Sequence, residues 1–154
     1  MTIAPEVSAH RIVVGIDGSL SSVAALNWAL RQAELTGATL EAVTTWEWPM
    51  TPAIGMVPPS DFDPKEDARK VLDEAIASAE PGHDGVSIES KVVGGPAGMA
   101  LVDASRGADL LVVGSRGHGE LVSFLLGSVS EHCVTHSHSP VLVVRDGEEP
   151  SGAD

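Results

Sequence analysis

Apolar residues recur along the chain with two spacings, which predict strands and helices in alternation. Five short runs rich in β-branched and aliphatic residues predict strands, at residues 11–16, 39–46, 86–93, 108–114 and 140–145. Between them, apolar residues at helical spacing predict four helices, at residues 20–36, 64–79, 97–106 and from about 127 to 136. Ser19 and Asp63 are predicted helix N-caps, and Gly37 is a predicted helix stop.

This alternation predicts the fold class. Strand–helix–strand units with mostly short connections form right-handed crossovers and one parallel sheet with helices on both faces. We therefore expect a single doubly wound, Rossmann-like α/β domain over residues 1–154, with a folded core at about 11–145. Residues 1–10 and the acidic tail at 146–154 are expected to be flexible. Ligands of such sheets bind beyond the carboxyl ends of the strands, so the turns after the first and fourth strands are candidate sites.

Composition narrows the range of partners and compartments. The 22 acidic and 9 basic side chains give a formal net charge of −13, which disfavours nucleic-acid binding by a basic surface. The one cysteine, Cys133, cannot form an intrachain disulfide, which is consistent with a reducing compartment. The N-terminal sequence has no signal-peptide pattern, and the apolar runs are too short to span a bilayer. These features predict a cytoplasmic protein that binds neither nucleic acid nor membranes.

The turn after the first predicted strand reads Gly15-Ile16-Asp17-Gly18-Ser19. Asp17 is open to two interpretations. It is a common turn residue, or its carboxylate faces the ligand crevice and binds ribose hydroxyls, an adenine amino group, or a metal that bridges phosphates.

The turn after the fourth predicted strand is rich in glycine. It reads Gly114-Ser115-Arg116-Gly117-His118-Gly119, and Gly127-Ser128-Val129-Ser130 begins the helix that follows. Glycines let backbone N–H groups approach a phosphate without Cβ interference, and a helix N-terminus with hydroxyls adds donors. The segment therefore has the composition of a phosphate cradle, but it is neither a Walker P-loop nor a G-x-G-x-x-G turn. Glycines needed only for a tight turn are the alternative.

These residues resemble a known family. Gly114-x2-Gly117-x9-Gly127-Ser128 matches the G-x2-G-x9-G-[ST] nucleotide motif of the universal stress protein family, and IVVGIDGS, Gly95-Pro96, ADLLVVGSRG and PVLVV are similar to its other segments in order. The resemblance implies the ATP-binding branch of the family, with strand order 3-2-1-4-5. It also implies a cytoplasmic homodimer that binds ATP, with or without magnesium, and acts by regulation in stress or growth arrest.

The resemblance also implies the residues of the nucleotide site. It assigns Gly15, Ile16 and Asp17 to adenine and ribose, and Val43 to adenine. It assigns phosphate and ribose contacts to Gly114, Gly117, Gly127, Ser128 and Ser130. Arg116, His118 and Val129 lie in the same segments and complete the candidate set.

Two alternative functions are kept. One is slow, magnesium-dependent ATP hydrolysis, although the sequence has no P-loop lysine and no G-x-S-x-G nucleophile motif. The other is an interaction protein with a vestigial pocket, which the intact motif disfavours. No catalytic or metal-binding residue is assigned, so the expectation is a protein that is not an enzyme beyond weak hydrolysis.

Three further features remain open. His132, Cys133, His136 and His138 would suit a soft metal, but a buried thiol with histidines at a helix C-terminus is the simpler interpretation. The proline-rich segment from Trp46 to Pro64 is a lid, an interface or a packed loop. The last strand, from Pro140 to Arg145, has no charge or mid-strand proline before its final residue, so we expect it to pair with its copy in a homodimer.

Overall fold

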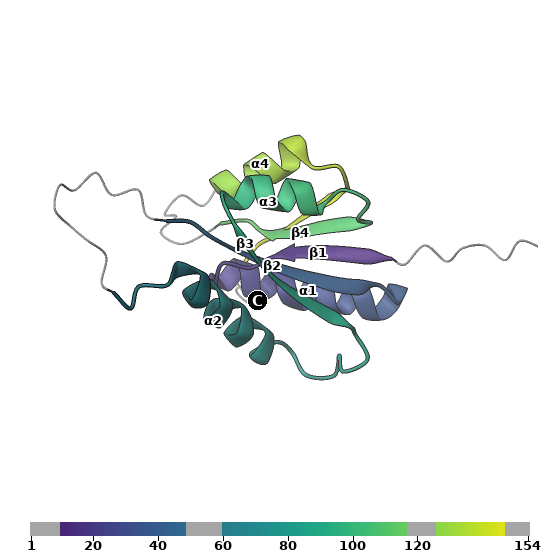
Figure 1. The fold of residues 1–154 in the computed structure, drawn as a ribbon. Coiled ribbons are helices and arrows are strands. Elements are labelled where there is room, and N and C mark those ends of the chain that lie inside the picture. Colours follow the sequence, from purple (N-terminus) through teal and green to yellow (C-terminus); the bar gives the residue numbers. More distant parts are fainter. Residues whose placement is uncertain (1–9, 49–59, 117–125, 147–154) are drawn as a thin grey trace, which may run out of the picture.

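The computed structural model describes residues 10–48, 60–116 and 126–146. Its centre is a five-stranded parallel sheet in the order β3-β2-β1-β4-β5, which confirms the predicted class and strand order (Figure 1). The strands are β1 (Arg11–Gly15), β2 (Thr39–Trp46), β3 (Ile88–Gly94), β4 (Leu110–Gly114) and β5 (Val141–Val144).

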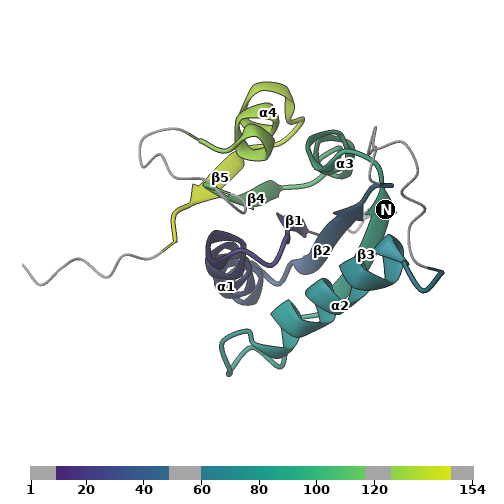
Figure 2. The same cartoon turned by 90° about the vertical axis from the view of Figure 1, so that its left-hand side faces the viewer.

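Four helices cover the two faces of this sheet. They are α1 (Leu20–Thr36), α2 (Pro64–Ala77), α3 (Ala97–Ala104) and α4 (Ser128–His136). Figure 2 shows α1 and α2 on one face and α3 and α4 on the other. The sequence therefore located every helix and strand found in the described residues, and the differences are shorter ends, such as α2 stopping at Ala77 and β3 starting at Ile88.

The central strands β1 and β4 are apolar on both sides because each face of the sheet has its own core. Along β1, Ile12 and Val14 pack toward α1, while Val13 packs with Leu101 of α3. The cores are aliphatic, as the scarcity of aromatic residues required. They hold the sheet between two helical layers and so fix the carboxyl ends of the strands in space.

The predicted caps set the helix boundaries. The Ser19 hydroxyl accepts the Ser22 N–H at 3.2 Å, and the Asp63 carboxylate accepts the Glu66 N–H at 3.1 Å. Gly37 ends α1 with φ of 73°, a left-handed conformation that glycine adopts without a Cβ penalty. The helices α1 and α2 therefore begin at residues whose side chains satisfy one of their first free N–H groups.

The winding of the chain places a crevice at the centre of the sheet. From β1 the chain runs outward to β2 and β3, then returns to the other side of β1 for β4 and β5. The connections after β1 and β4 leave the sheet in opposite directions, so their turns separate at the carboxyl edge. No helix in the described part of the chain is long and apolar enough to cross a membrane.

Candidate functional site

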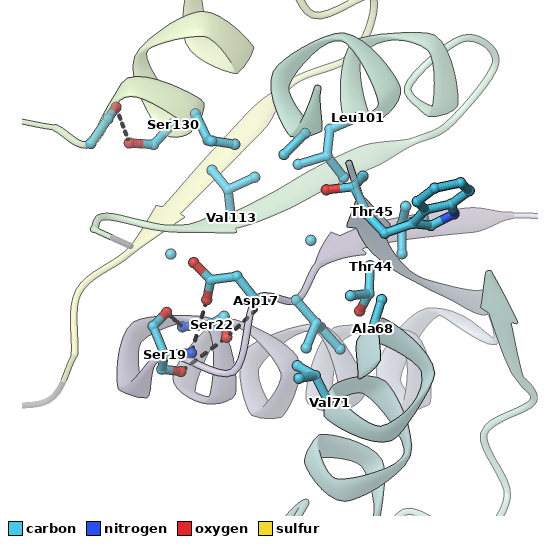
Figure 3. A pocket seen from close by; sticks show the side chains of 18 of the residues that line it. Asp17, Ser19, Ser22, Thr44, Thr45, Ala68, Val71, Leu101, Val113 and Ser130 are labelled. Carbon is cyan, nitrogen blue, oxygen red and sulfur yellow. Dashed lines mark hydrogen bonds between the residues drawn. The ribbon is translucent and has the colours of Figure 1, made fainter. Parts of the chain in front are cut away.

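A pocket of about 470 Å³ opens at the carboxyl edge of the sheet, between the ends of β1, β2 and β4 (Figure 3). Its lining includes every described residue that the sequence analysis assigned to the nucleotide: Gly15, Ile16, Asp17, Val43, Gly114, Arg116, Gly127, Ser128, Val129 and Ser130. Gly117 and His118 lie outside the described residues. Residues from three separate parts of the chain thus meet around one cavity of a size typical for small-molecule sites.

Asp17 lies at the start of α1 with its carboxylate facing this cavity (Figure 3). Its Oδ1 accepts the Ser19 N–H at 2.9 Å, and Ser19 in turn caps the helix. The two interpretations of Asp17 are therefore compatible, because a carboxylate fixed by the turn is also presented to a ligand.

Gly114 is required for packing at the end of β4. A Cβ on Gly114 would lie 2.5 Å from Ser21 Oγ and 2.7 Å from the Ser21 carbonyl carbon. The sequence analysis attributed the small size of this glycine to room for phosphates, and the structure supplies a different reason. The absence of a side chain lets the first turn of α1 approach β4, which closes the floor of the pocket.

The start of α4 forms one wall of the pocket. Gly127 is its N-cap and makes no side-chain cap bond, while its own N–H donates to the Ser115 carbonyl at 2.8 Å. Ser128 and Val129, at the first two positions of the helix, line the pocket. N–H groups at a helix N-terminus lack intrahelical acceptors and favour an anion.

Ser130 has a structural bond network beneath this wall. Its buried hydroxyl lies 2.9 Å from the Gly127 carbonyl and 3.2 Å from the Ser115 carbonyl, and donates its proton to them. These hydrogen bonds stabilise the turn that leads into α4 and hold the helix N-terminus in place. Direct contact of Ser130 with a phosphate stays a prediction.

Arg116 lines the pocket on the β4 side and is tied to the end of the sheet. Its Nη2 lies 3.1 Å and 3.3 Å from the two carboxylate oxygens of Asp146, which follows β5. Its backbone carbonyl accepts the Ser21 hydroxyl, which fixes the loop after β4 against α1. Arg116 therefore links the pocket both to α1 and to the β5 segment.

The opposite wall was not found from the sequence. It comes from the end of β2 and from the first turns of α2, and its residues are Thr44, Thr45, Trp46, Glu47, Pro64, Asp67, Ala68 and Val71. The sequence analysis took the turns after the first and fourth strands as candidate sites, and the family resemblance added only Val43 from β2.

Thr44 is the unusual residue of this wall. It is 5% exposed, and its Oγ1 has no hydrogen-bond partner among the described residues. Figure 3 shows Thr44 next to Ala68 of α2. A buried hydroxyl without a partner costs stability and is found most often where a ligand or water completes it.

The histidine and cysteine cluster lies on α4 and in the turn that follows it. Cys133 is fully buried, and burial raises the pKa of its thiol from 9.0 to about 11. The His132 and His136 rings lie 4.5 Å apart on α4. Within the described ranges, no three His, Cys, Asp or Glu side chains gather closely enough to hold a metal ion.

Three aromatic side chains pack together near the end of β2, and one of them, Trp46, lines the pocket. Trp46 and Trp48 pack edge to face with ring centroids 6.2 Å apart, and Trp48 lies at the same distance from Phe62. The intervening residues 49–59 lie outside the described chain, so the lid or interface role of this loop stays a prediction.

Comparison with known proteins places this site in context. A model of the universal stress protein family matches residues 8–145. The chain is 35% identical over 144 residues to a universal stress protein of Mycobacterium tuberculosis strain H37Rv, an alignment that covers 93% of this chain and 51% of that protein. A second relative, from Mycolicibacterium smegmatis, is 32% identical over 91% of this chain and 49% of its own length. The chain thus spans about half the length of the curated relatives it matches.

Solved structures share the fold over nearly the whole chain. A universal stress protein in complex with cAMP has a TM-score of 0.68 at 30% identity, over 90% of this chain and 98% of that one. A family member from Burkholderia pseudomallei has a TM-score of 0.62 at 28% identity, over 91% and 98%. A protein from Arabidopsis thaliana with AMP bound has the same fold, with a TM-score of 0.62 at 21% identity over 94% and 97%.

Proposed function

Because this chain belongs to the universal stress protein family, we propose that it is a regulatory module that binds an adenine nucleotide. The observation that carries the proposal is a pocket in which the described residues of the family's nucleotide motif, Gly114, Gly127 and Ser128, meet the end of β1. The likeness to a family member bound to cAMP, at 30% identity, supports the same ligand class.

The pocket has the two kinds of surface that a nucleotide needs. At the end formed by β2 and α2, Val43, Ala68 and Val71 are apolar and suit a flat heteroaromatic base. At the other end, the first turn of α4 offers N–H donors and a favourable helix dipole to a phosphate. Asp17 stands between them, within the reach expected for ribose hydroxyls.

The finer form of the proposal follows the motif resemblance. The ligand class includes ATP, with or without magnesium, and the protein acts in the cytoplasm during stress or growth arrest. Gly117 and His118 are assigned to the phosphate side of this site on the motif alone.

We propose binding without efficient turnover, because three of the serine hydroxyls that line the pocket already stabilise the fold. Ser19 caps α1, the Ser22 hydroxyl donates to the Ser19 carbonyl at 2.9 Å, and Ser130 braces α4. Any of these three hydroxyls would have to give up its hydrogen bond in the fold before it could act as a nucleophile or proton acceptor. Hydrolysis would then depend on Asp17 and a bound metal, and would be slow.

The protein is further proposed to be a homodimer through the strand that begins at Pro140 and ends at Arg145. In the sheet, β5 is an edge strand that pairs only with β4 among the described strands. An apolar edge of this kind can pair antiparallel with its copy about a two-fold axis.

Mass spectrometry of small molecules released from freshly purified, denatured protein tests the proposal, together with calorimetric titration of AMP and ATP. We expect a co-purified adenine nucleotide or measurable binding, and no phosphate release above that of a heat-denatured control. Absence of both nucleotide and binding would favour an interaction protein with a vestigial pocket. Sustained phosphate release would favour a hydrolase.

A further inference from the structure

The charge around the pocket is unusual for a site that receives phosphates. Among the described lining residues, the ionisable side chains are Asp17, Glu47, Asp67 and Arg116, so carboxylates outnumber the one cation. The segment at 117–125, GHGELVSFL, adds no lysine or arginine in sequence. Among the described lining residues, positive charge for a phosphate therefore comes from Arg116 and from backbone N–H groups.

The charge of Arg116 is already paired. Its Nη2 contacts both carboxylate oxygens of Asp146, at 3.1 Å and 3.3 Å. The Arg116 side chain is 29% exposed and that of Asp146 is 36% exposed, so solvent screens this pair only in part. Asp146 lies two residues beyond the end of β5, so a segment from the sheet edge sets the charge available to the pocket.

This arrangement has opposite consequences for nucleotides of different charge. AMP carries about two negative charges and ATP about four, because each phosphate adds acidic oxygens. The N-terminus of α4 can hold one phosphate by hydrogen bonds and its dipole, which needs little net charge. A triphosphate would bring its further charges into a pocket lined by three carboxylates, where the charge of Arg116 is already offset by Asp146, and like charges in a partly desolvated site repel.

We propose that Asp146, through its pair with Arg116, makes this pocket select nucleoside monophosphates over triphosphates when no divalent cation is present. The inference rests on the proposed nucleotide binding and concerns the specificity of the same site. Asp146 is a positioning residue here, because it acts on the ligand through the Arg116 side chain.

The test compares the Kd of AMP and ATP in EDTA, by calorimetry, for the wild type and three variants. Asp146→Asn removes the charge at nearly constant size, and Asp146→Glu keeps it. Asp84→Asn makes the same charge change on the exposed turn between α2 and β3. The strand β3 is the edge strand on the other side of the sheet from β5. Thermal unfolding of each variant checks that it is folded.

We expect the wild type to bind AMP more tightly than ATP. In Asp146→Asn the ratio of the ATP Kd to the AMP Kd should fall about 3- to 10-fold, the effect of one nearby charge in a partly screened site. Asp146→Glu and Asp84→Asn should keep the wild-type ratio. Raising the salt concentration should reduce the ratio in the wild type more than in Asp146→Asn, because salt screens the charge of Asp146. A purely structural role of Asp146 would not depend on salt in this way.

Two results would overturn the inference while leaving nucleotide binding intact. One is tighter binding of ATP than of AMP to the wild type in EDTA. The other is an unchanged ratio in Asp146→Asn, whether both affinities stay the same or fall together. If the wild type bound neither nucleotide, the proposed function itself would be wrong, and the inference would fall with it.

Discussion

Thr44 and Ser105 are both buried hydroxyl residues, but only Ser105 has its bonds satisfied. The Ser105 hydroxyl donates to the Val102 carbonyl at 2.6 Å and accepts the His138 N–H at 2.9 Å, whereas Thr44 Oγ1 has no partner among the described residues. The two hydroxyls therefore affect the free energy of unfolding in opposite directions. A buried hydroxyl without a hydrogen-bond partner lowers it, whereas a paired one does not.

Thr44→Val should leave the free energy of unfolding of the ligand-free protein unchanged or raise it, since valine has the same shape and needs no partner. Ser105→Ala should lower it by about 1–3 kcal/mol, because it leaves the His138 N–H without an acceptor. Urea unfolding followed by circular dichroism measures both. A large loss of stability in Thr44→Val would mean that the hydroxyl has a structural partner.

Cys133 makes stability depend on pH in the alkaline range. Burial raises the pKa of its thiol from 9.0 to about 11, so the unfolded chain loses this proton first as pH rises. The unfolded state then binds fewer protons than the folded state, and the free energy of unfolding falls between pH 9.0 and about 11.

We expect the wild type to lose about 1–2 kcal/mol more than Cys133→Ala over this interval. Unfolding curves of the two proteins at matched pH values measure the difference, because other titrating groups are common to both. Parallel losses in the two proteins would show that the thiol is accessible in the folded state.

The residue scale also shows what the sequence could and could not predict. The caps at Ser19 and Asp63 were predictable, because capping depends on residues two or three positions away. The reason for Gly114 was not, because Ser21 approaches it from a distant part of the chain. The same holds for Arg116, whose partner Asp146 belongs to the segment expected to be a flexible tail.

Among the helices and strands, α4 is the one that we most expect to bind the phosphate of a ligand. Its N-terminus has no side-chain cap, and Ser128 at its first position is exposed to the pocket. A carboxylate introduced there would interact well with the helix dipole but would occupy the place of a phosphate.

Ser128→Asp should therefore keep or slightly raise the melting temperature while weakening AMP binding by about tenfold or more, the effect of an added like charge. Ser128→Asn, of the same size and neutral, should lose much less affinity. Calorimetric titration and thermal unfolding measure the two effects. Equal AMP affinities of the Ser128→Asp and Ser128→Asn variants would show that the phosphate does not bind at the start of α4.

The elements also show where sequence reasoning stops. Periodicity located α2 and its cap, but it could not place the first turns of α2 beside the end of β2. The position of α2 depends on the long connection from Trp46 to Pro64. The length and proline content of such a connection do not determine where the helix after it packs. The wall formed by Pro64, Asp67, Ala68 and Val71 was therefore missed.

At the scale of the whole molecule, the sheet edge at β5 determines how two copies could assemble. The Pro140 and Val144 carbonyls accept N–H groups of Leu111 and Ser115, at 2.9 Å and 2.8 Å. In a parallel strand the direction alternates by residue, so the N–H groups of Val141 and Val143 point away from β4. These groups are the ones that a second copy would pair with.

Val143→Pro should give a folded monomer by light scattering, because proline removes an outward N–H without removing a bond to β4. Lysines in β5 would be a less specific test, since Val143 and Leu142 also pack against the two cores. Circular dichroism checks that the variant is folded. A variant that remains dimeric, or a wild type that is monomeric at micromolar concentration, would place the interface elsewhere or exclude it.

Nucleotide binding at the carboxyl edge is the central claim, and amide NMR during titration with AMP tests both binding and location. We predict chemical-shift changes at Asp17, Thr45 and Ser128, which line the pocket. We predict none at Thr39 or Asp109, which lie at the amino ends of β2 and β4, away from the pocket. No shifts at millimolar AMP, or shifts confined to the opposite edge, would contradict the account.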